Sequence, residues 1–130
     1  MEAHDVRAAV DRLSELRISE ATTDAEAKAA FARLDSFNHG GIFVGRFSGA
    51  TPWERHPHGD ELVHVLDGEV NLTVLTDGEP VRVTLRAGSV FVVPQGLWHR
   101  QVARAAVTLL TATPTPTDIS AADDPRSEPR

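Results

Sequence analysis

Residues 61–96 read ELVHVLDGEVNLTVLTDGEPVRVTLRAGSVFVVPQG, and this stretch decides the fold class of the chain. It consists of short runs rich in β-branched residues, and glycine, proline and aspartate separate one run from the next. Such runs are typical of strands, and the residues between them are typical of turns. Over the whole chain, strands are predicted near residues 42–48, 53–57, 61–66, 70–75, 81–85, 90–93, 98–103 and 107–112. Many short strands at regular spacing predict an all-β sandwich or small barrel.

The N-terminal part of the chain has a different pattern, which predicts a short helical extension. One apolar face of a first helix is formed by Val6, Ala9, Val10, Leu13 and Leu16. A second helix is expected to begin at Thr23, because Thr23 and Glu26 can form a capping box, and its apolar stripe runs to about residue 34. We expect both helices to cover a sheet or a subunit contact.

The C-terminal stretch 114–130 reads PTPTDISAADDPRSEPR and is expected to be a disordered or loosely attached tail. It contains four prolines and many charges, and Ile119 is its only large apolar residue. Such a segment buries too little apolar surface to offset the entropy of ordering it. The predicted organisation is therefore a helical extension over 1–37, a β-barrel over 38–113 and a tail over 114–130.

The length and charge of the chain limit its partners. A chain of 130 residues fits a single domain. The net charge is −6 and Lys28 is the only lysine, so we expect no nucleic acid partner. No apolar run approaches the length of a membrane span, and the charged N-terminus does not resemble a secretory signal, so we expect a cytoplasmic protein without a membrane partner. The chain has no cysteine, so a metal site cannot use thiolate ligands.

Two patches of the sequence carry a resemblance to a known family. In the first patch six residues separate Glu61 from Gly68, and in the second Gly88, Pro94, Gly96 and His99 have the spacing G-x5-P-x-G-x2-H. These patches resemble the two short motifs of the cupin superfamily. The resemblance implies a double-stranded β-helix, or jelly-roll, barrel over about residues 40–112. Ala103 stands where the family has an asparagine, and the N-terminal part lies outside the resemblance.

A metal site is expected where the two patches meet. Residues i and i+2 of a strand share a face, and a tight turn can place a carboxylate on the next strand beside them. His56, Glu61 and His99 are the three ligands that we expect. Two histidines and one carboxylate are typical of mononuclear sites with open coordination positions. The ion is expected to be a divalent Fe, Mn, Ni or Zn.

The first patch, ERHPHGDELVHVLDG at residues 54–68, allows two registers for the fourth ligand. The family spacing before Glu61 leads back to His56 and then to Glu54, which replaces an imidazole by a carboxylate. The alternative pairs His56 with His58 and leaves only two residues before Glu61, which strains the turn. Strand alternation and turn length restrict positions more tightly than ligand type does, so Glu54 is preferred and His58 stays open.

Other polar and aromatic residues near these patches have simpler interpretations. His64 lies three residues beyond Glu61, so it is expected to face away from the site. Trp53 and Trp98 each adjoin a proposed ligand and are expected to pack on the opposite face. Arg46 and Gln101 are candidates for substrate contacts.

Two functions are compatible with such a site. The first is a metal-dependent small-molecule enzyme; the resemblance implies dioxygenase or isomerase chemistry, and the absence of tyrosine excludes a tyrosine acid or base. The second is a non-catalytic module that binds a metal or small ligand and acts as a sensor, and a weaker third is a structural metal that closes the barrel mouth. Exposed barrel edges also predict a homodimer.

Overall fold

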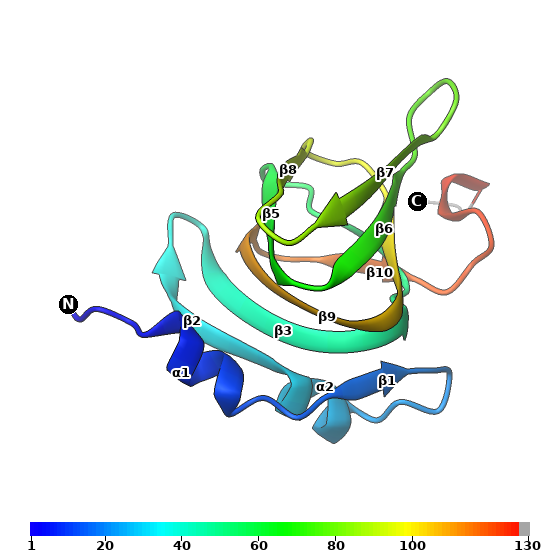
Figure 1. The fold of residues 1–130 in the computed structure, drawn as a ribbon. Helices are drawn as coiled ribbons and strands as arrows, with labels where there is room; N and C mark the ends of the chain where they lie inside the picture. The colour runs from blue at the N-terminus through cyan, green and yellow to red at the C-terminus, as the bar shows by residue number, and fades with distance from the viewer. Residues whose placement is uncertain (128–130) are drawn as a thin grey trace.

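The computed structural model describes residues 1–127, apart from the side chains of residues 24 and 28. Within this range the chain forms ten strands and little helix (Figure 1). The strands are β1 (Leu16–Ile18), β2 (Phe31–Phe37), β3 (Gly40–Ala50), β4 (Trp53–Arg55), β5 (Glu61–Asp67), β6 (Glu69–Val74), β7 (Val81–Arg86), β8 (Val90–Val93), β9 (His99–Pro114) and β10 (Asp118–Ser120). The helical elements are α1 (Val6–Asp11), α2 (Asp24–Ala30) and the 3-10 turn η1 (Pro125–Ser127). The all-β class predicted from the sequence is confirmed. None of the helices in the described range is long and apolar enough to cross a bilayer.

Strand β9 is the longest strand and joins the two sides of the barrel. It pairs with β3 over almost its whole length, and on its other side with β6 at residues 99–102 and with β5 at residues 108–112. Between these two partners, residues 104–106 form a bulge, because two steps along β3 correspond to four steps along β9 there. A bulge bends a strand and increases its twist. Strands β3 and β9 consequently curve together, and the sheet closes on itself (Figure 1).

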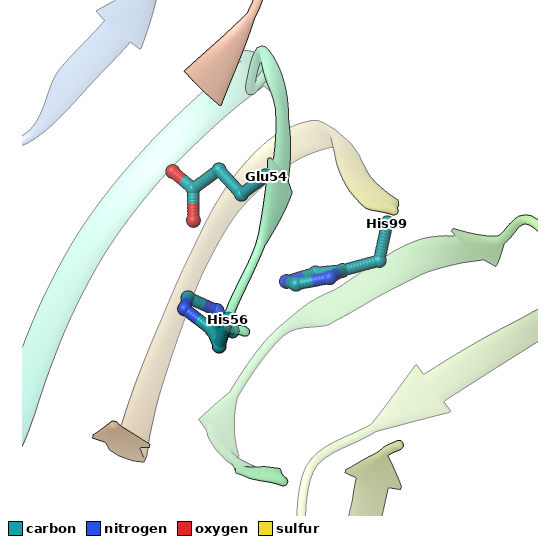
Figure 2. A group of neighbouring side chains, drawn as sticks. All are labelled: Glu54, His56 and His99. Carbon is teal, nitrogen blue, oxygen red and sulfur yellow. The ribbon is translucent and has the colours of Figure 1, made fainter. Parts of the chain in front are cut away.

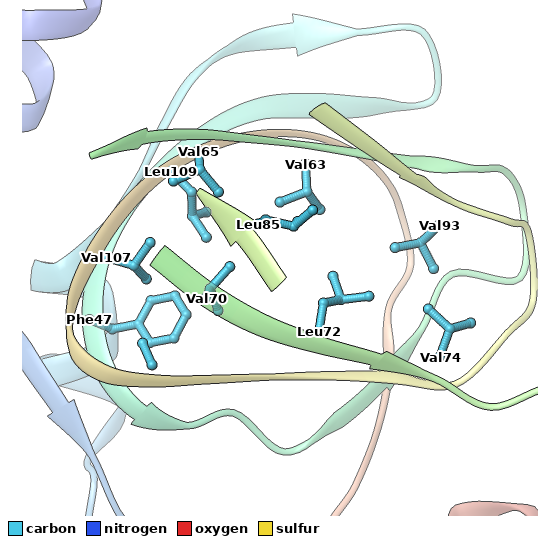
Figure 3. Close-up of a cluster of buried hydrophobic side chains, with 11 residues drawn as sticks. Phe47, Val63, Val65, Val70, Leu72, Val74, Leu85, Val93, Val107 and Leu109 are labelled. Carbon is cyan, nitrogen blue, oxygen red and sulfur yellow. The ribbon is translucent and has the colours of Figure 1, made fainter. Parts of the chain in front are cut away.

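Apolar side chains of the curled sheet fill the inside of the barrel. In β5, the fully buried Val63 and Val65 alternate with half-buried residues, as strand geometry requires. Figure 3 shows a cluster of such side chains enclosed by the curved strands. Its buried members are Phe47, Val63, Val65, Val70, Leu72, Val74, Leu85, Val93, Ala103, Val107 and Leu109. Burying one large aliphatic side chain stabilises a fold by about 1.5–3 kcal/mol, so this cluster supplies much of the stability.

The N-terminal extension is less helical than the sequence predicts. Helix α1 ends at Asp11, and Leu16, the last residue of the expected stripe, belongs to β1. Helix α2 begins as predicted, with both hydrogen bonds of the capping box at Thr23, but it ends at Ala30, and residues 31–37 form β2. The reason is packing, since the ring of Phe31 lies 5.7 Å from that of Phe47, over a glycine of β3. Packing against the barrel outweighs the helical pattern there.

The C-terminal segment is also more regular than predicted. Residues 118–120 form β10, which pairs with β4 in antiparallel register. The guanidinium of Arg55 donates a hydrogen bond of 2.8 Å to Asp118 and links the side chains of the two strands. Backbone pairing and this ion pair hold a segment that has few apolar side chains of its own. Residues 128–130 of the predicted tail lie outside the described residues, and the domain limits at 37/38 and 113/114 stay predictions.

Strands β7 and β8 are among the strands of the described sheet that have a partner on one side only. Strand β7 pairs with β6, and β8 pairs with β5. Three of their valines are exposed, Val81, Val90 and Val92. Edges of this kind are usually covered in solution, so the homodimer stays a prediction.

Candidate metal centre

Strands β4 and β9 bring three of the predicted ligands together at one end of the barrel. Glu54 and His56 are two residues apart, so their side chains point to the same side of the chain. Glu54 pairs directly with His99 in the ladder between β4 and β9. Ligand atoms of these three side chains all lie within 4.8 Å of one another. Figure 2 shows that the carboxylate and the two rings face a common space.

The carboxylate of Glu61 lies between the two imidazoles. Its Oε2 is 3.3 Å from Nε2 of His56, and its Oε1 is 3.2 Å from Nε2 of His99. The exposed fraction is 5% for Glu61 and 2% for each histidine, so this group is shielded from water. Four side chains, two carboxylates and two imidazoles, therefore form one compact polar cluster at the barrel mouth.

The hydrogen bonds of the two rings show which nitrogen is directed into the site. Nδ1 of His99 lies 3.1 Å from the carbonyl oxygen of Leu97, and since a carbonyl only accepts, Nδ1 carries the proton. Nδ1 of His56 lies 3.0 Å from the hydroxyl of Thr117. Both Nε2 atoms are buried and have no hydrogen bond of good geometry. Buried polar atoms without such partners are uncommon, and two of them facing one carboxylate fit a divalent cation.

The charges within this cluster shift the pKa values of its members. Burial raises the pKa of Glu54, and the neighbouring charge of Glu61 raises it further. Burial also acts to raise the pKa of Glu61, but the close contacts of its carboxylate with both imidazoles outweigh it and lower the pKa to about 2. For His99, burial acts to lower the pKa, but the contact with Glu61 outweighs it and raises the pKa. Without a metal, the site therefore favours an ionised Glu61 and a proton on His99.

The structure brings together four of the five residues expected as ligands. Glu54, His56, Glu61 and His99 meet, whereas His58 is exposed and lies outside the group, so the geometry favours Glu54 over His58 as the companion of His56. Gln95 holds the turn that carries His58. Its backbone N–H donates a hydrogen bond to the carboxylate of Asp60, and its side-chain amide donates one to the carbonyl of Pro57. That anchoring leaves the His58 ring in solvent.

The remaining candidates occupy other positions. His64 faces away from the site, and its Nδ1 lies 3.1 Å from the Ser89 carbonyl. Arg46 donates to the hydroxyl of Thr108, a residue that alternates with the core residues of β9 and so lies on the outer face. Gln101 shares the inner face with His99, and its buried Oε1 has no hydrogen bond partner in the described chain, so it remains the better candidate for a substrate contact.

Sequence reasoning missed two threonines that contact the cluster. The hydroxyl of Thr113 donates a hydrogen bond of 2.6 Å to Oε2 of Glu61, and Thr117 contacts His56 as described above. Thr111 is 2.8 Å from Thr113, hydroxyl to hydroxyl, which extends this network into the barrel. The sequence contains one indication of this role. Threonines occur at every second position from 111 to 117, and on a continuous strand they share a face with the buried Leu109.

Two tryptophans and two arginines lie on the outer face, opposite the site residues, and keep the two site segments aligned. Trp53 and Arg55 flank Glu54 on β4, and Trp98 and Arg100 flank His99. The guanidinium of Arg55 lies 4.5 Å from the ring centre of Trp98, and that of Arg100 lies 4.6 Å from the ring centre of Trp53. The two cation–π pairs therefore bridge the strands on both sides of the Glu54–His99 pair. Both tryptophans are buried on this outer face, as expected.

Replacing Arg100 by glutamine is expected to destabilise the protein by about 0.5–1 kcal/mol, because the substitution removes one of these cation–π pairs. The measurement is the free energy of unfolding from urea denaturation. Arg104→Gln, on the same strand but exposed, is the matched control and is expected to stay within about 0.5 kcal/mol of wild type. Equal effects of the two substitutions would show that the Arg100–Trp53 contact does not help to hold the strands.

A curled antiparallel barrel with imidazoles and carboxylates gathered at its mouth defines a class of small β-barrel proteins. The chain belongs to the cupin family, because the family model for the cupin domain matches residues 47–112. The fold is thus the predicted double-stranded β-helix. The matched residues include all four members of the cluster, whereas Thr113 and Thr117 lie beyond them.

The chain is similar to curated proteins and to solved structures of the same fold. Germin-like protein 1 of Brassica napus is 35% identical over 94 residues, which cover 64% of this chain and 45% of that protein. The chain spans less than half the length of the curated relatives that it matches. An oxalate oxidase structure is 25% identical with a TM-score of 0.51, covering 56% of this chain and 40% of the other. Hydroquinone 1,2-dioxygenase PnpCD, solved with Cd²⁺ and 4-hydroxybenzonitrile, is 23% identical with a TM-score of 0.56, covering 71% of this chain and 69% of the other, and so shares the fold.

Proposed function

We propose that the chain binds one divalent metal ion through His56, Glu61 and His99, with Glu54 as a fourth ligand, and that it acts on a small organic molecule. The observation that carries this proposal is the pair of buried Nε2 atoms, which face opposite oxygens of one carboxylate and lack good hydrogen bonds. Nitrogen and oxygen ligands of this kind suit Fe, Mn, Ni or Zn.

Each residue of the cluster would have a separate role at such a centre. When bound, the metal supplies a Lewis acid or an oxygen activator. Glu61 supplies negative charge, and the bond between His99 and the Leu97 carbonyl keeps Nε2 directed at the ion. Glu54 is the least buried of the four and is the group best placed to take or give a proton, since the chain has no tyrosine.

The class of reaction rests on the relatives. Among the similar structures are an oxalate oxidase and a hydroquinone dioxygenase, both of which act on small organic molecules. We therefore propose oxidation or isomerisation of a small acid or phenol. In this chain a carboxylate, Glu54, stands where the family motif places a histidine, so both the preferred metal and the reaction are expected to differ from those of sites with three histidines.

A second candidate function is a metal-binding sensor without turnover. The observation that favours it is the burial of the cluster, since Glu61 and both imidazoles are almost inaccessible to solvent. A closed site suits an ion that is held for a long time. An enzyme needs room for its substrate beside the ion.

The experiment begins with elemental analysis of protein purified without added metal, followed by titration with Mn(II), Fe(II), Co(II), Ni(II) and Zn(II). We expect one ion per chain, lost in His56→Ala and in His99→Ala. The matched control is His58→Ala, which changes an exposed histidine two residues from His56 and is expected to keep the ion. A wild type that takes up no ion from this series would refute the proposal. Loss of the ion in His58→Ala would refute the ligand assignment.

Turnover separates the two candidate functions. Metal-loaded protein is incubated with a panel of small carboxylic acids and phenols, and oxygen uptake and product formation are measured. Turnover that disappears in His99→Ala supports the enzyme. Tight binding of metal without turnover across the panel supports the sensor.

A further inference from the structure

The C-terminal segment 115–120, here called the strap, supports strand β4 at the metal centre. Strand β4 carries Glu54, but its ladder with β9 contains only the pair Glu54↔His99. With β10 the same strand forms three pairs, Asp118↔Arg55, Ile119↔Glu54 and Ser120↔Trp53. The backbone of β4 is therefore held mainly from the strap side.

The strap also contacts one of the proposed ligands directly. The hydroxyl of Thr117 lies 3.0 Å from Nδ1 of His56, which is 2% exposed. If Nε2 of His56 is to offer its lone pair to a cation, the ring proton has to be on Nδ1, and Nδ1 then donates to Thr117. Such a bond fixes both the tautomer and the orientation of a metal-binding imidazole.

The strap buries little apolar surface of its own. Thr115, Pro116 and Ile119 are exposed, and Ile119, its one large apolar side chain, is 64% exposed. A cavity of about 440 Å³ lies against its outer side, lined in part by Asp118 and Ile119. Segments with few buried apolar contacts open locally at low free energy. The order of the strap therefore depends largely on polar contacts, and one of these is the contact of Thr117 with the buried His56 ring.

We propose that Thr117 is a positioning residue of the metal centre, and that metal binding and ordering of the strap are coupled through the bond between Thr117 and His56. The inference rests on the proposed metal site and extends it to residues beyond the matched cupin region. Coupling of this kind is reciprocal. A bound ion holds His56 in one orientation and so stabilises the strap, and an ordered strap presents His56 to the ion.

The first test measures Co(II) affinity and the Co(II) visible spectrum in threonine variants. Thr117→Val keeps the side-chain shape but removes the hydroxyl, and it is expected to weaken Co(II) binding about 10–100-fold and to change the spectrum. Thr117→Ser keeps the hydroxyl and is expected to behave like wild type. Thr115→Val is the matched control on the strap, because the Thr115 hydroxyl bonds the carbonyl of His39 and touches no member of the cluster.

The second test uses wild-type protein and does not depend on any variant folding. Hydrogen–deuterium exchange of peptides covering 115–121 is compared with and without Zn(II), with the β6–β7 turn at 75–80 as an internal control. We expect slower exchange in the strap when Zn(II) is bound, and a smaller change in the β6–β7 turn. If wild type binds neither Co(II) nor Zn(II), the proposed function fails. If it binds them but Thr117→Val matches wild type and strap exchange is unchanged, only the present inference fails.

Discussion

Replacing Glu61 by glutamine is expected to weaken Co(II) or Mn(II) binding by about 100-fold or more. The substitution keeps the shape of the side chain but removes the negative charge between the two imidazoles. Removing one partner of a buried charged pair costs about 3–5 kcal/mol, and 1.4 kcal/mol corresponds to a tenfold change in affinity. Metal titration followed by absorption or calorimetry measures the change.

The matched control for this substitution is Glu69→Gln. Glu69 also lies at the start of a strand, but it is exposed and pairs with Arg86 at 3.4 Å on the surface. Exposed pairs contribute little, so this variant is expected to bind metal like wild type. Equal metal affinity of Glu61→Gln and wild type would exclude Glu61 as a ligand and leave Glu54 as the only carboxylate at the centre.

The contributions of Glu61 and His99 to the stability of the metal-free protein are expected to be complete together between about pH 4.5 and 6.5. The pKa of Glu61 lies at about 2 in the folded chain against an ordinary value of 4.5, so its contribution is complete above pH 4.5 and is lost as the pH falls towards 2. That difference corresponds to about 3 kcal/mol. The pKa of His99 is raised, so its contribution is complete below its ordinary value of 6.5 and is lost as the pH rises through the folded value.

With metal bound, the loss of stability that His99 causes at rising pH is expected to be replaced by a gain. A cation needs neutral imidazoles, so it competes with the proton that the site favours on His99. Urea denaturation across pH 2 to 9, with chelator or with Zn(II), measures both curves. We expect Zn(II) to stabilise the protein much more at pH 8 than at pH 5. Equal stabilisation at both values would show that no imidazole proton is released on binding. In Glu61→Gln, the acid loss between pH 4.5 and 2 is expected to shrink.

The barrel and half of its site follow from local sequence patterns. Alternating apolar residues and glycine-rich turns predict strands because both depend on a few neighbouring residues. The spacing of Gly88, Pro94, Gly96 and His99 fixes a turn and the strand after it, so His99 could be predicted. Strand alternation predicted Glu54 on the same side as His56. His58 is exposed, so strand alternation and turn length were a better guide to position than the preference for a second histidine.

The remainder depends on contacts between distant parts of the chain. Residues 27–34 have a helical stripe, and only the presence of β3 makes a strand from Phe31 onward more favourable. The two strands predicted at 98–103 and 107–112 are one strand with a bulge, because β3 continues alongside both. Thr113 and Thr117 acquire a role only when the end of β9 meets Glu61 and the strap meets His56. No local pattern contains that information.

Strand β9 contributes to the same carboxylate from both of its ends. His99, its first residue, faces Oε1 of Glu61, and Thr113, near its last, donates to Oε2. Both residues point inward because the bulge at 104–106 adds an even number of positions relative to β3, which keeps odd-numbered residues inside on either side of it. Insertions or deletions at this point are therefore compatible with an intact centre only in multiples of two, since a single-residue change would turn one half of the strand inside out.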